Sequence, residues 1–211
     1  MLEILFKFII SYLLGSILGS VIIGKIIGVD IRTMGSGNAG GTNAFRSRGA
    51  KFASLVLFID ILKGYIAVSF IADLNIIMLN NIFSIDSDLL AIICGSGVVI
   101  GHVYPIYHQF KGGKGAGTMV GVLMSIDYIT LLICLLIWII ILVLTGYVGL
   151  STMIAGVIFP ISIGFFKGIY SPIGIFSIIV SIFIIFTHRS NIIRMLNGEE
   201  NRFHKIMFLK K

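Results

Sequence analysis

Long apolar runs are the feature that most constrains the fold of this chain. Residues 131–144 contain no charged side chain, and residues 4–23 contain only Lys7. Of all 211 residues, 57% are hydrophobic, which is more apolar surface than a soluble domain of this length can bury. Because the backbone must satisfy its own hydrogen bonds in lipid, and because apolar and polar residues do not alternate, the runs predict membrane-spanning helices rather than a β-barrel.

The runs predict an all-α polytopic membrane protein with seven spanning helices in a single domain over residues 1–211. The expected helices cover residues 4–24, 52–72, 89–100, 115–125 and 131–144, with a sixth ending near Phe166 and a seventh near Thr187. The first run is long for the core of a signal peptide and is interpreted as a retained span.

Charge sets the expected orientation. All but three of the 16 Lys and Arg residues fall on one side of the seven-helix arrangement, the exceptions being Lys7, Lys63 and Lys167. The positive-inside rule assigns that side to the cytoplasm, so the N-terminus is expected outside and the C-terminus inside. The net charge of +7 then needs no nucleic-acid partner. The basic tail, with Lys205, Lys210 and Lys211, is expected to lie near anionic lipid.

The segment 101–118, GHVYPIYHQFKGGKGAGT, is polar in an otherwise apolar region. Bare amides at Gly112 and Gly113 between Lys111 and Lys114, ahead of a helix start, are the chemistry of a phosphate cradle. It is not a Walker A loop, because Gly115 stands where Ser or Thr is required. The alternative is a flexible glycine turn between two helices.

Two further segments are expected on the same membrane face. The segment 35–49, GSGNAGGTNAFRSRG, combines small hydrogen-bonding residues with Arg46, whose guanidinium suits bidentate anion binding. The third begins with the cluster 188–191, His-Arg-Ser-Asn, at a helix end. The alternative for segment 35–49 is a cytoplasmic loop that obeys the charge rule. The alternative for the segment that begins at His188 is a membrane-surface tail.

Several chemistries are disfavoured. The only carboxylates expected on the polar face are Asp30, Glu199 and Glu200, too few for a two-metal centre. No Gly-x-Ser-x-Gly elbow is present, and no His is followed by Asp five positions later. Positioning and electrostatics remain, with no cofactor expected. A small phosphate or organic-anion transporter is the rival function, although no internal repeat is evident.

The segments SGNAGGTNAFRSRG, GHVYPIYHQFKGGKG and HRSNIIRMLNGEE resemble, in this order, three motifs of the PlsY family of bacterial membrane acyltransferases. The resemblance covers nearly the whole chain. It implies transfer of a fatty acyl group from acyl phosphate to the 1-hydroxyl of glycerol 3-phosphate, in phospholipid biosynthesis. It also implies a multi-pass protein of the bacterial inner membrane, in contact with membrane lipid and monomeric, with its active site on the cytoplasmic side.

The family pattern implies roles for individual residues. Arg46, Lys114 and His188 are the expected catalytic residues. Together with Ser36 and Asn191 they are expected to hold glycerol phosphate, and the amides of Gly112 and Gly113 to cradle acyl phosphate. The remaining expected substrate-binding residues are Gly37, Asn38, Thr42, Asn43 and Lys111. Either His188 or an oxygen of the substrate phosphate takes the proton, and the good leaving group favours the phosphate.

Other polar residues have structural interpretations. Asp60 and Lys63, three residues apart inside a span, are expected to form a pair that holds a loop. His102 and His108 are expected to form hydrogen bonds at a helix end. Arg194, Glu200 and Arg202 are expected to support the third motif, with Glu200 paired to a nearby Arg.

Overall fold

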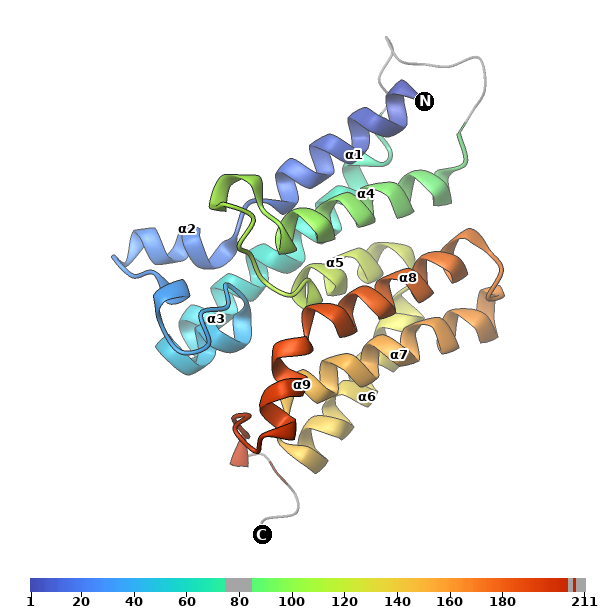
Figure 1. Ribbon diagram of the computed structural model, residues 1–211. Coiled ribbons are helices and arrows are strands. Elements are labelled where there is room, and N and C mark those ends of the chain that lie inside the picture. The colour runs from blue at the N-terminus through green and yellow to red at the C-terminus, as the bar shows by residue number, and fades with distance from the viewer. Residues whose placement is uncertain (75–84, 205–206, 208–211) are drawn as a thin grey trace. The chain divides into compact units, whose positions relative to one another are not determined.

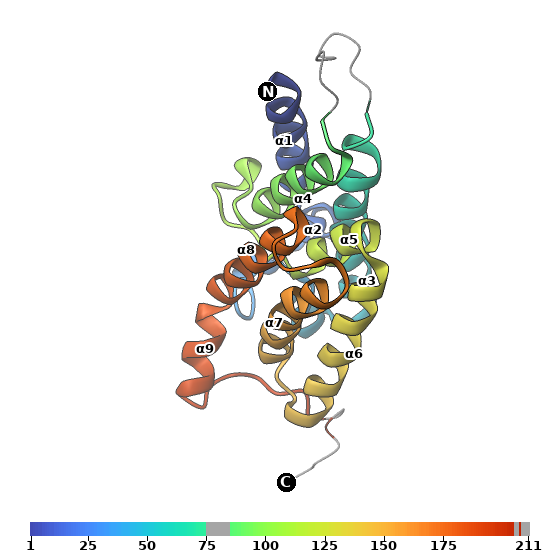
Figure 2. The same cartoon turned by 90° about the vertical axis from the view of Figure 1, so that its right-hand side faces the viewer.

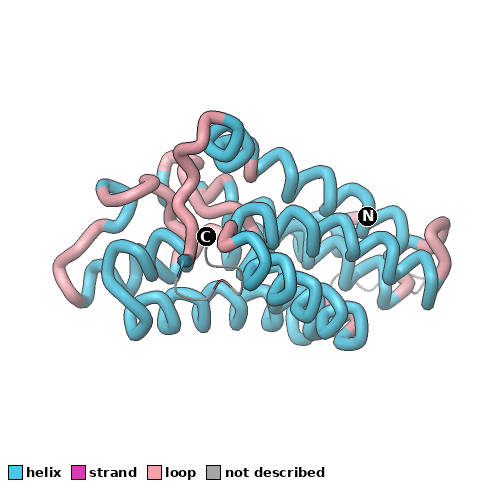
Figure 3. Tube along the Cα trace, turned by 90° about the horizontal axis from the view of Figure 1, so that it is seen from below, coloured by secondary structure: helices cyan, strands magenta, loops and turns pink. Residues whose placement is uncertain are grey.

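The computed structural model describes residues 1–74, 85–204 and 207, and the regular elements in these ranges are helices (Figure 3). Residues 75–84, between the second and third predicted helices, and the tail residues Lys205, Lys210 and Lys211 lie outside them. The chain divides into two compact units, Met1–Ile126 and Asp127–Lys211, each described by itself.

The first unit holds α1 (Leu2–Gly15), α2 (Gly19–Ile26), the 3₁₀ helix η1 (Ile31–Thr33), α3 (Gly41–Ile66), the π-helix η2 (Ala67–Ile71), α4 (Ser87–Val103), the 3₁₀ helix η4 (Ile106–His108) and α5 (Ala116–Ile126). The second holds α6 (Tyr128–Thr145), α7 (Val148–Lys167), α8 (Pro172–Thr187) and α9 (Arg189–Leu196). The predicted third to seventh helices are confirmed, with their ends shifted by a few residues.

In the first unit α1 packs along α4 (Figure 1), and α3 packs along α5 (Figure 2). The α1–α4 contact is close because Gly97 and Gly101 of α4 face the backbone of α1, where an added Cβ would overlap the carbonyls of Phe8 and Tyr12. Small residues that let two helix backbones approach are a usual device of membrane proteins. In the second unit α7 packs between α6 and α8, and α9 contacts α7 and α8.

The prediction of one unbroken helix over residues 4–24 was wrong. The helix stops at Gly15, and Leu18 has an extended backbone (φ −99°, ψ 120°) before α2 begins at Gly19. The carbonyls of Gly15 and Ile17 accept hydrogen bonds from the Lys63 ammonium, which accounts for the break.

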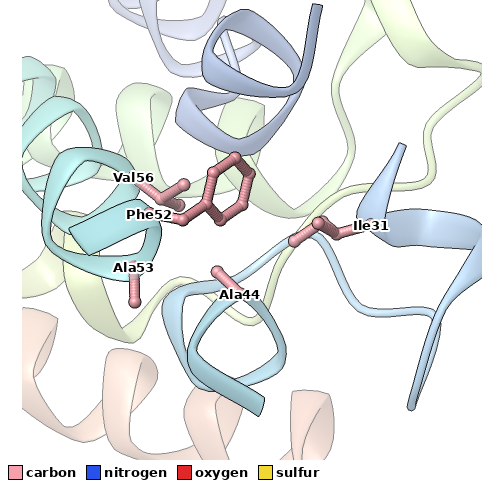
Figure 4. Packing of buried hydrophobic residues seen from close by; sticks show 5 residues of the cluster. All are labelled: Ile31, Ala44, Phe52, Ala53 and Val56. Carbon is pink, nitrogen blue, oxygen red and sulfur yellow. The ribbon is translucent and has the colours of Figure 1, made fainter. Parts of the chain in front are cut away.

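The second helix begins eleven residues earlier than predicted, so Thr42, Asn43 and Arg46 lie on a helix rather than in a loop. At Gly49 the backbone leaves the helical region (φ 78°, ψ −175°) and α3 bends sharply. Figure 4 shows the apolar cluster that holds the bend, formed by Ile31, Ala44, Phe52, Ala53 and Val56.

In the described part of the chain, five helical segments are long and apolar enough to cross a membrane: Leu2–Ile26, Gly41–Ile71, Ser87–His108, Tyr128–Thr145 and Val148–Lys167. Pro172–Thr187 with Arg189–Leu196 adds a sixth if this pair, bent by 50°, is one span. The helix Ala116–Ile126 is shorter.

Candidate active site

The loop before α3 is organised by the side chain of Asn43. Its Nδ2 donates to the carbonyls of Ile31 (2.9 Å), Met34 (3.0 Å) and Asn38 (3.0 Å), while its Oδ1 accepts from the Ser36 amide (3.0 Å). Asn43 is 3% exposed. The Asn43 amide group therefore shapes the loop, and the expectation that Asn43 binds substrate stays a prediction.

Asn43→Leu is expected to lower the free energy of unfolding by about 2–4 kcal/mol, because a side chain of similar size leaves several loop groups unpaired. Thermal unfolding in detergent measures the loss. Asn38→Ala is the matched control, since its side chain accepts one hydrogen bond, from the Gly40 amide (2.8 Å). An Asn43→Leu protein that unfolds at the temperature of the control would contradict this role.

The shaped loop presents the other predicted residues of the first segment. Ser36 is exposed and Gly37 has a left-handed backbone (φ 70°). Thr42 and Arg46 are half-buried and lie four residues apart on α3, which puts them on one face of the helix. Thus Ser36, Thr42 and Arg46 are placed by the same short stretch of structure.

The loop between α4 and α5 does not leave its glycine amides free. The Gly112 amide donates to the Val103 carbonyl (3.2 Å) and the Gly113 amide to the His102 carbonyl (3.1 Å). In this structure both amides are therefore bonded within the loop, and the expectation that they cradle a phosphate stays a prediction. Glycine suits position 113 for another reason: an added Cβ would overlap the His102 imidazole.

The predicted helix start beyond this loop is confirmed, because α5 begins at Ala116. Lys114 is half-buried and Lys111 exposed, and the half-buried lysine lies two residues before the first turn of α5. The N-terminal amides of a helix attract anions, so this helix start beside Lys114 can bind phosphate without the two glycine amides.

The two loops of the first unit are brought to one place by Leu57. Since α3 is bent, its first residue, Gly41, returns to this side chain, and an added Cβ would lie 2.6 Å from Leu57 Cδ2. A Cβ on Gly117, in the first turn of α5, would lie 3.5 Å from the same atom. The start of α3, with Thr42 and Arg46, therefore lies beside the start of α5, with Lys114.

At the start of η1 the Asp30 carboxylate and the Arg32 guanidinium form a bidentate pair (2.9 and 2.7 Å). The hydrogen bonds from Arg32 hold the pKa of the Asp30 carboxyl below its usual value. Asp30, one of the three carboxylates expected on the polar face, is thus paired with Arg32 where η1 begins.

His188 lies at the junction of α8 and α9 in the second unit and is 5% exposed. Its Nδ1 is 2.8 Å from the Ile184 carbonyl oxygen, which can only accept, so the proton of the neutral ring lies on Nδ1. Nε2 is then the acceptor nitrogen. Asn191, also buried, follows in the first turn of α9 and lies against Gly149 of α7.

The remaining residues of the third motif hold α9 in place. Arg194 Nε donates to Glu200 Oε2 (2.7 Å), and the Glu200 side chain is 1% exposed, which confirms the predicted pair. The Arg202 guanidinium stacks over the Tyr147 ring, 4.6 Å from its centre. The Phe203 amide donates to the Gly146 carbonyl (2.9 Å), so this part of the tail closes over the α6–α7 turn.

Glu200→Gln is expected to lower stability by about 1–3 kcal/mol, because a neutral amide replaces a buried carboxylate that accepts from Arg194. Glu199→Gln, at an exposed neighbour, is the control and is expected to change stability by less than about 0.5 kcal/mol. Thermal unfolding of both variants in detergent measures the difference, and equal midpoints would refute the role of the pair.

Taken with the apolar helices, this arrangement defines an all-helical integral membrane protein with cation-rich segments at helix ends. A family model described as "Glycerol-3-phosphate acyltransferase" matches residues 5–198. The chain belongs to the glycerol-3-phosphate acyltransferase family.

Curated relatives with that name include proteins of Chlorobium limicola (37% identical, covering 83% of this chain and 85% of the relative) and Brucella anthropi (36% identical, covering 82% and 79%). Crystal structures of PlsY (YgiH), described as an integral membrane glycerol 3-phosphate acyltransferase, are similar in their glycerol 3-phosphate form (TM-score 0.81) and lysophosphatidic acid form (TM-score 0.80). Each is 36% identical to this chain, and each match covers 95% of both chains.

Proposed function

We propose that this protein transfers a fatty acyl group from acyl phosphate to the 1-hydroxyl of glycerol 3-phosphate. The hydroxyl oxygen bonds to the acyl carbon, the bond from that carbon to the phosphate oxygen breaks, and the hydroxyl proton leaves with the phosphate. The products are lysophosphatidic acid and inorganic phosphate, so the reaction begins phospholipid assembly. The observation that carries the proposal is the 95% coverage by a relative solved with glycerol 3-phosphate.

Both substrates bear phosphate, and the site residues suit two phosphoryl groups. We assign Arg46, Lys114 and the start of α5 to phosphate binding, with Ser36, Gly37, Asn38, Thr42 and Lys111 around them. By the resemblance of their motif we assign His188 and Asn191 to the binding of glycerol phosphate, and we propose that residues 1–211 form a single catalytic domain. Electrostatic stabilisation of the acyl transfer is the main source of rate in such a site, without a cofactor.

The neutral His188 ring carries its proton on Nδ1, so its Nε2 is the acceptor. It either receives the hydroxyl proton or accepts a hydrogen bond while a phosphate oxygen receives it. His188→Gln keeps a polar side chain that does not titrate near neutrality. We expect the variant to be slower but to keep the shape of the pH–rate profile, because the substrate phosphate is the base. Loss of a pH step near pH 6–7 in the variant would instead identify His188 as the base.

We also propose seven passes through the bacterial inner membrane, with the N-terminus outside and the active site at the cytoplasmic face. The charge distribution supports this orientation. With 11 residues α5 is only about 16 Å long, roughly half of a bilayer core. Its packing along α3 suits a short pass enclosed by protein.

The rival function, transport of phosphate or an organic anion, is separated by an assay in detergent, where no transport is possible. Purified protein is supplied with glycerol 3-phosphate and, in turn, acyl phosphate, acyl-CoA and acyl carrier protein. Release of inorganic phosphate with acyl phosphate, dependent on glycerol 3-phosphate, is the expected result. Activity with another donor alone would overturn the proposed donor, and no activity with any donor would favour the transporter.

We propose that the active form is a monomer.

A further inference from the structure

A buried charged cluster lies in the first unit, outside the residues assigned to substrate. Lys63 Nζ is 3.2 Å from Asp60 Oδ1 and 2.9 Å from His102 Nδ1. The three residues are 2–3% exposed. Buried ionic groups are costly in a membrane protein unless they are paired, and they usually have a role beyond stability.

Each charge of the cluster faces a helix end of opposite polarity. The Lys63 ammonium donates to the carbonyls of Gly15 (2.8 Å) and Ile17 (2.6 Å), where α1 ends. Asp60 Oδ1 accepts from the amide of Gly19 (3.3 Å), where α2 begins. The pair thus stabilises the break in the first membrane segment through the helix dipoles, and an exchange of the two charges would not.

His102 joins the cluster to the glycine–lysine loop. Since Lys63 donates to Nδ1, the imidazole proton lies on Nε2. The His102 ring lies against Gly113, and the His102 carbonyl accepts from the Gly113 amide. The ring that Lys63 orients therefore sets the position of the residue immediately before Lys114.

The same cluster leads to the loop that carries Ser36. Beyond the break, α2 ends at Ile26 and the chain continues to Val29 and Ile31, which pack in the apolar cluster with residues of α3. The Ile31 carbonyl accepts from Asn43. The glycine–lysine loop is fastened to the break as well, because the Ile106 amide donates to Ser16 Oγ (3.3 Å). The loop of Ser36 and the loop of Lys114 are thus both connected to the break between α1 and α2, which Lys63 contacts.

We infer that Asp60, Lys63 and His102 form a positioning cluster that fixes the loop of Ser36 and the loop of Lys114 relative to each other. It contacts no substrate itself. Its value for catalysis rests on the proposed function, since two phosphoryl groups must be held at a set separation for acyl transfer. The predicted charge pair at Asp60 and Lys63 is then part of a larger unit that includes His102.

Two His102 variants of similar size separate positioning from packing. Asn retains an acceptor near the place of Nδ1, whereas Leu does not. Spin labels on Thr33→Cys and Gln109→Cys, both exposed, report the separation of the two loops, in a background where the buried Cys94 and Cys134 are Ala. We expect a narrow distance distribution in the background protein and in His102→Asn, and a broad or shifted one in His102→Leu.

Kinetics of the same variants provide the second readout. In His102→Leu we expect kcat/KM for glycerol 3-phosphate to fall by roughly 10–100-fold, with a change of less than about 3-fold in His102→Asn. Gly113→Ala disturbs the contact between the His102 ring and the loop, because the added Cβ would overlap the imidazole, and it is expected to broaden the same distance distribution. It also tests the inference should His102→Leu not fold.

The outcomes separate the two proposals. An unchanged distance distribution in the folded His102→Leu or Gly113→Ala protein would overturn the positioning role, whatever the activity. A broadened distribution in a protein that transfers no acyl group even as wild type would support positioning and overturn the proposed function.

Discussion

Lys63→Met is expected to destabilise the protein by about 3–5 kcal/mol, the largest effect that the structure predicts for a single substitution. The change leaves the buried Asp60 carboxylate without its cation and the carbonyls of Gly15 and Ile17 without their donor. Methionine fits the space of the lysine stem, so lost packing contributes little. Denaturation of the purified protein in detergent, compared with wild type, measures the effect.

A double variant tests whether this loss comes from the unpaired charge. Asp60→Asn with Lys63→Met removes both charges, and it is expected to be more stable than Lys63→Met alone. Lys7 is the matched control, because it is also a buried lysine but lies elsewhere in the fold. It pairs with Glu3 (2.9 Å) and donates to the Ala72 carbonyl (2.6 Å). If the double variant were less stable than Lys63→Met, the unpaired carboxylate would not be the cause.

Arg46→Ala is expected to lower kcat/KM by roughly 100-fold, or about 3 kcal/mol, while changing stability little. The half-buried guanidinium stands near the start of α3, beside the start of α5, where phosphate is expected to bind. Arg46→Lys keeps the charge but loses the planar fork, so it is expected to recover only part of the rate. Steady-state rates with both substrates varied measure the effect.

Arg48→Ala provides the control for Arg46. Arg48 is two residues further along α3 and exposed. Residues two apart in a helix point to different faces, so loss of the Arg48 side chain is expected to change the rate by less than about 2-fold. Equal losses in Arg46→Ala and Arg48→Ala would show that general positive charge, rather than a specific contact, supports the reaction.

The sequence was sufficient to predict the helical membrane fold, most helix positions and the family, because long apolar runs and three ordered motifs are local features. It was insufficient where distant residues decide the local structure. The break after Gly15 depends on Lys63, 48 residues away. Likewise, the polar composition of residues 41–48 concealed a helix that packs through Ala44 against Phe52.

In the candidate site, too, some features could be predicted from the sequence and others could not. The pairing of Glu200 with Arg194 was predictable because the two lie six residues apart in one motif. The roles of Gly113 and Asn43 were not, because a glycine-rich pattern does not distinguish a free amide from one bonded to His102, nor an asparagine that binds substrate from one that holds its own loop. The second case had a usable signal, since Asn close to a glycine-rich turn often bonds to nearby backbone.

The central claim is that this protein binds glycerol 3-phosphate and that Arg46 and His188 are needed for this binding, and titration calorimetry with glycerol 3-phosphate tests it most directly. The wild-type protein in detergent is expected to show one saturable site that is lost or strongly weakened in both Arg46→Ala and His188→Gln. Binding that persists unchanged in either variant would contradict the role of the residue replaced in that variant.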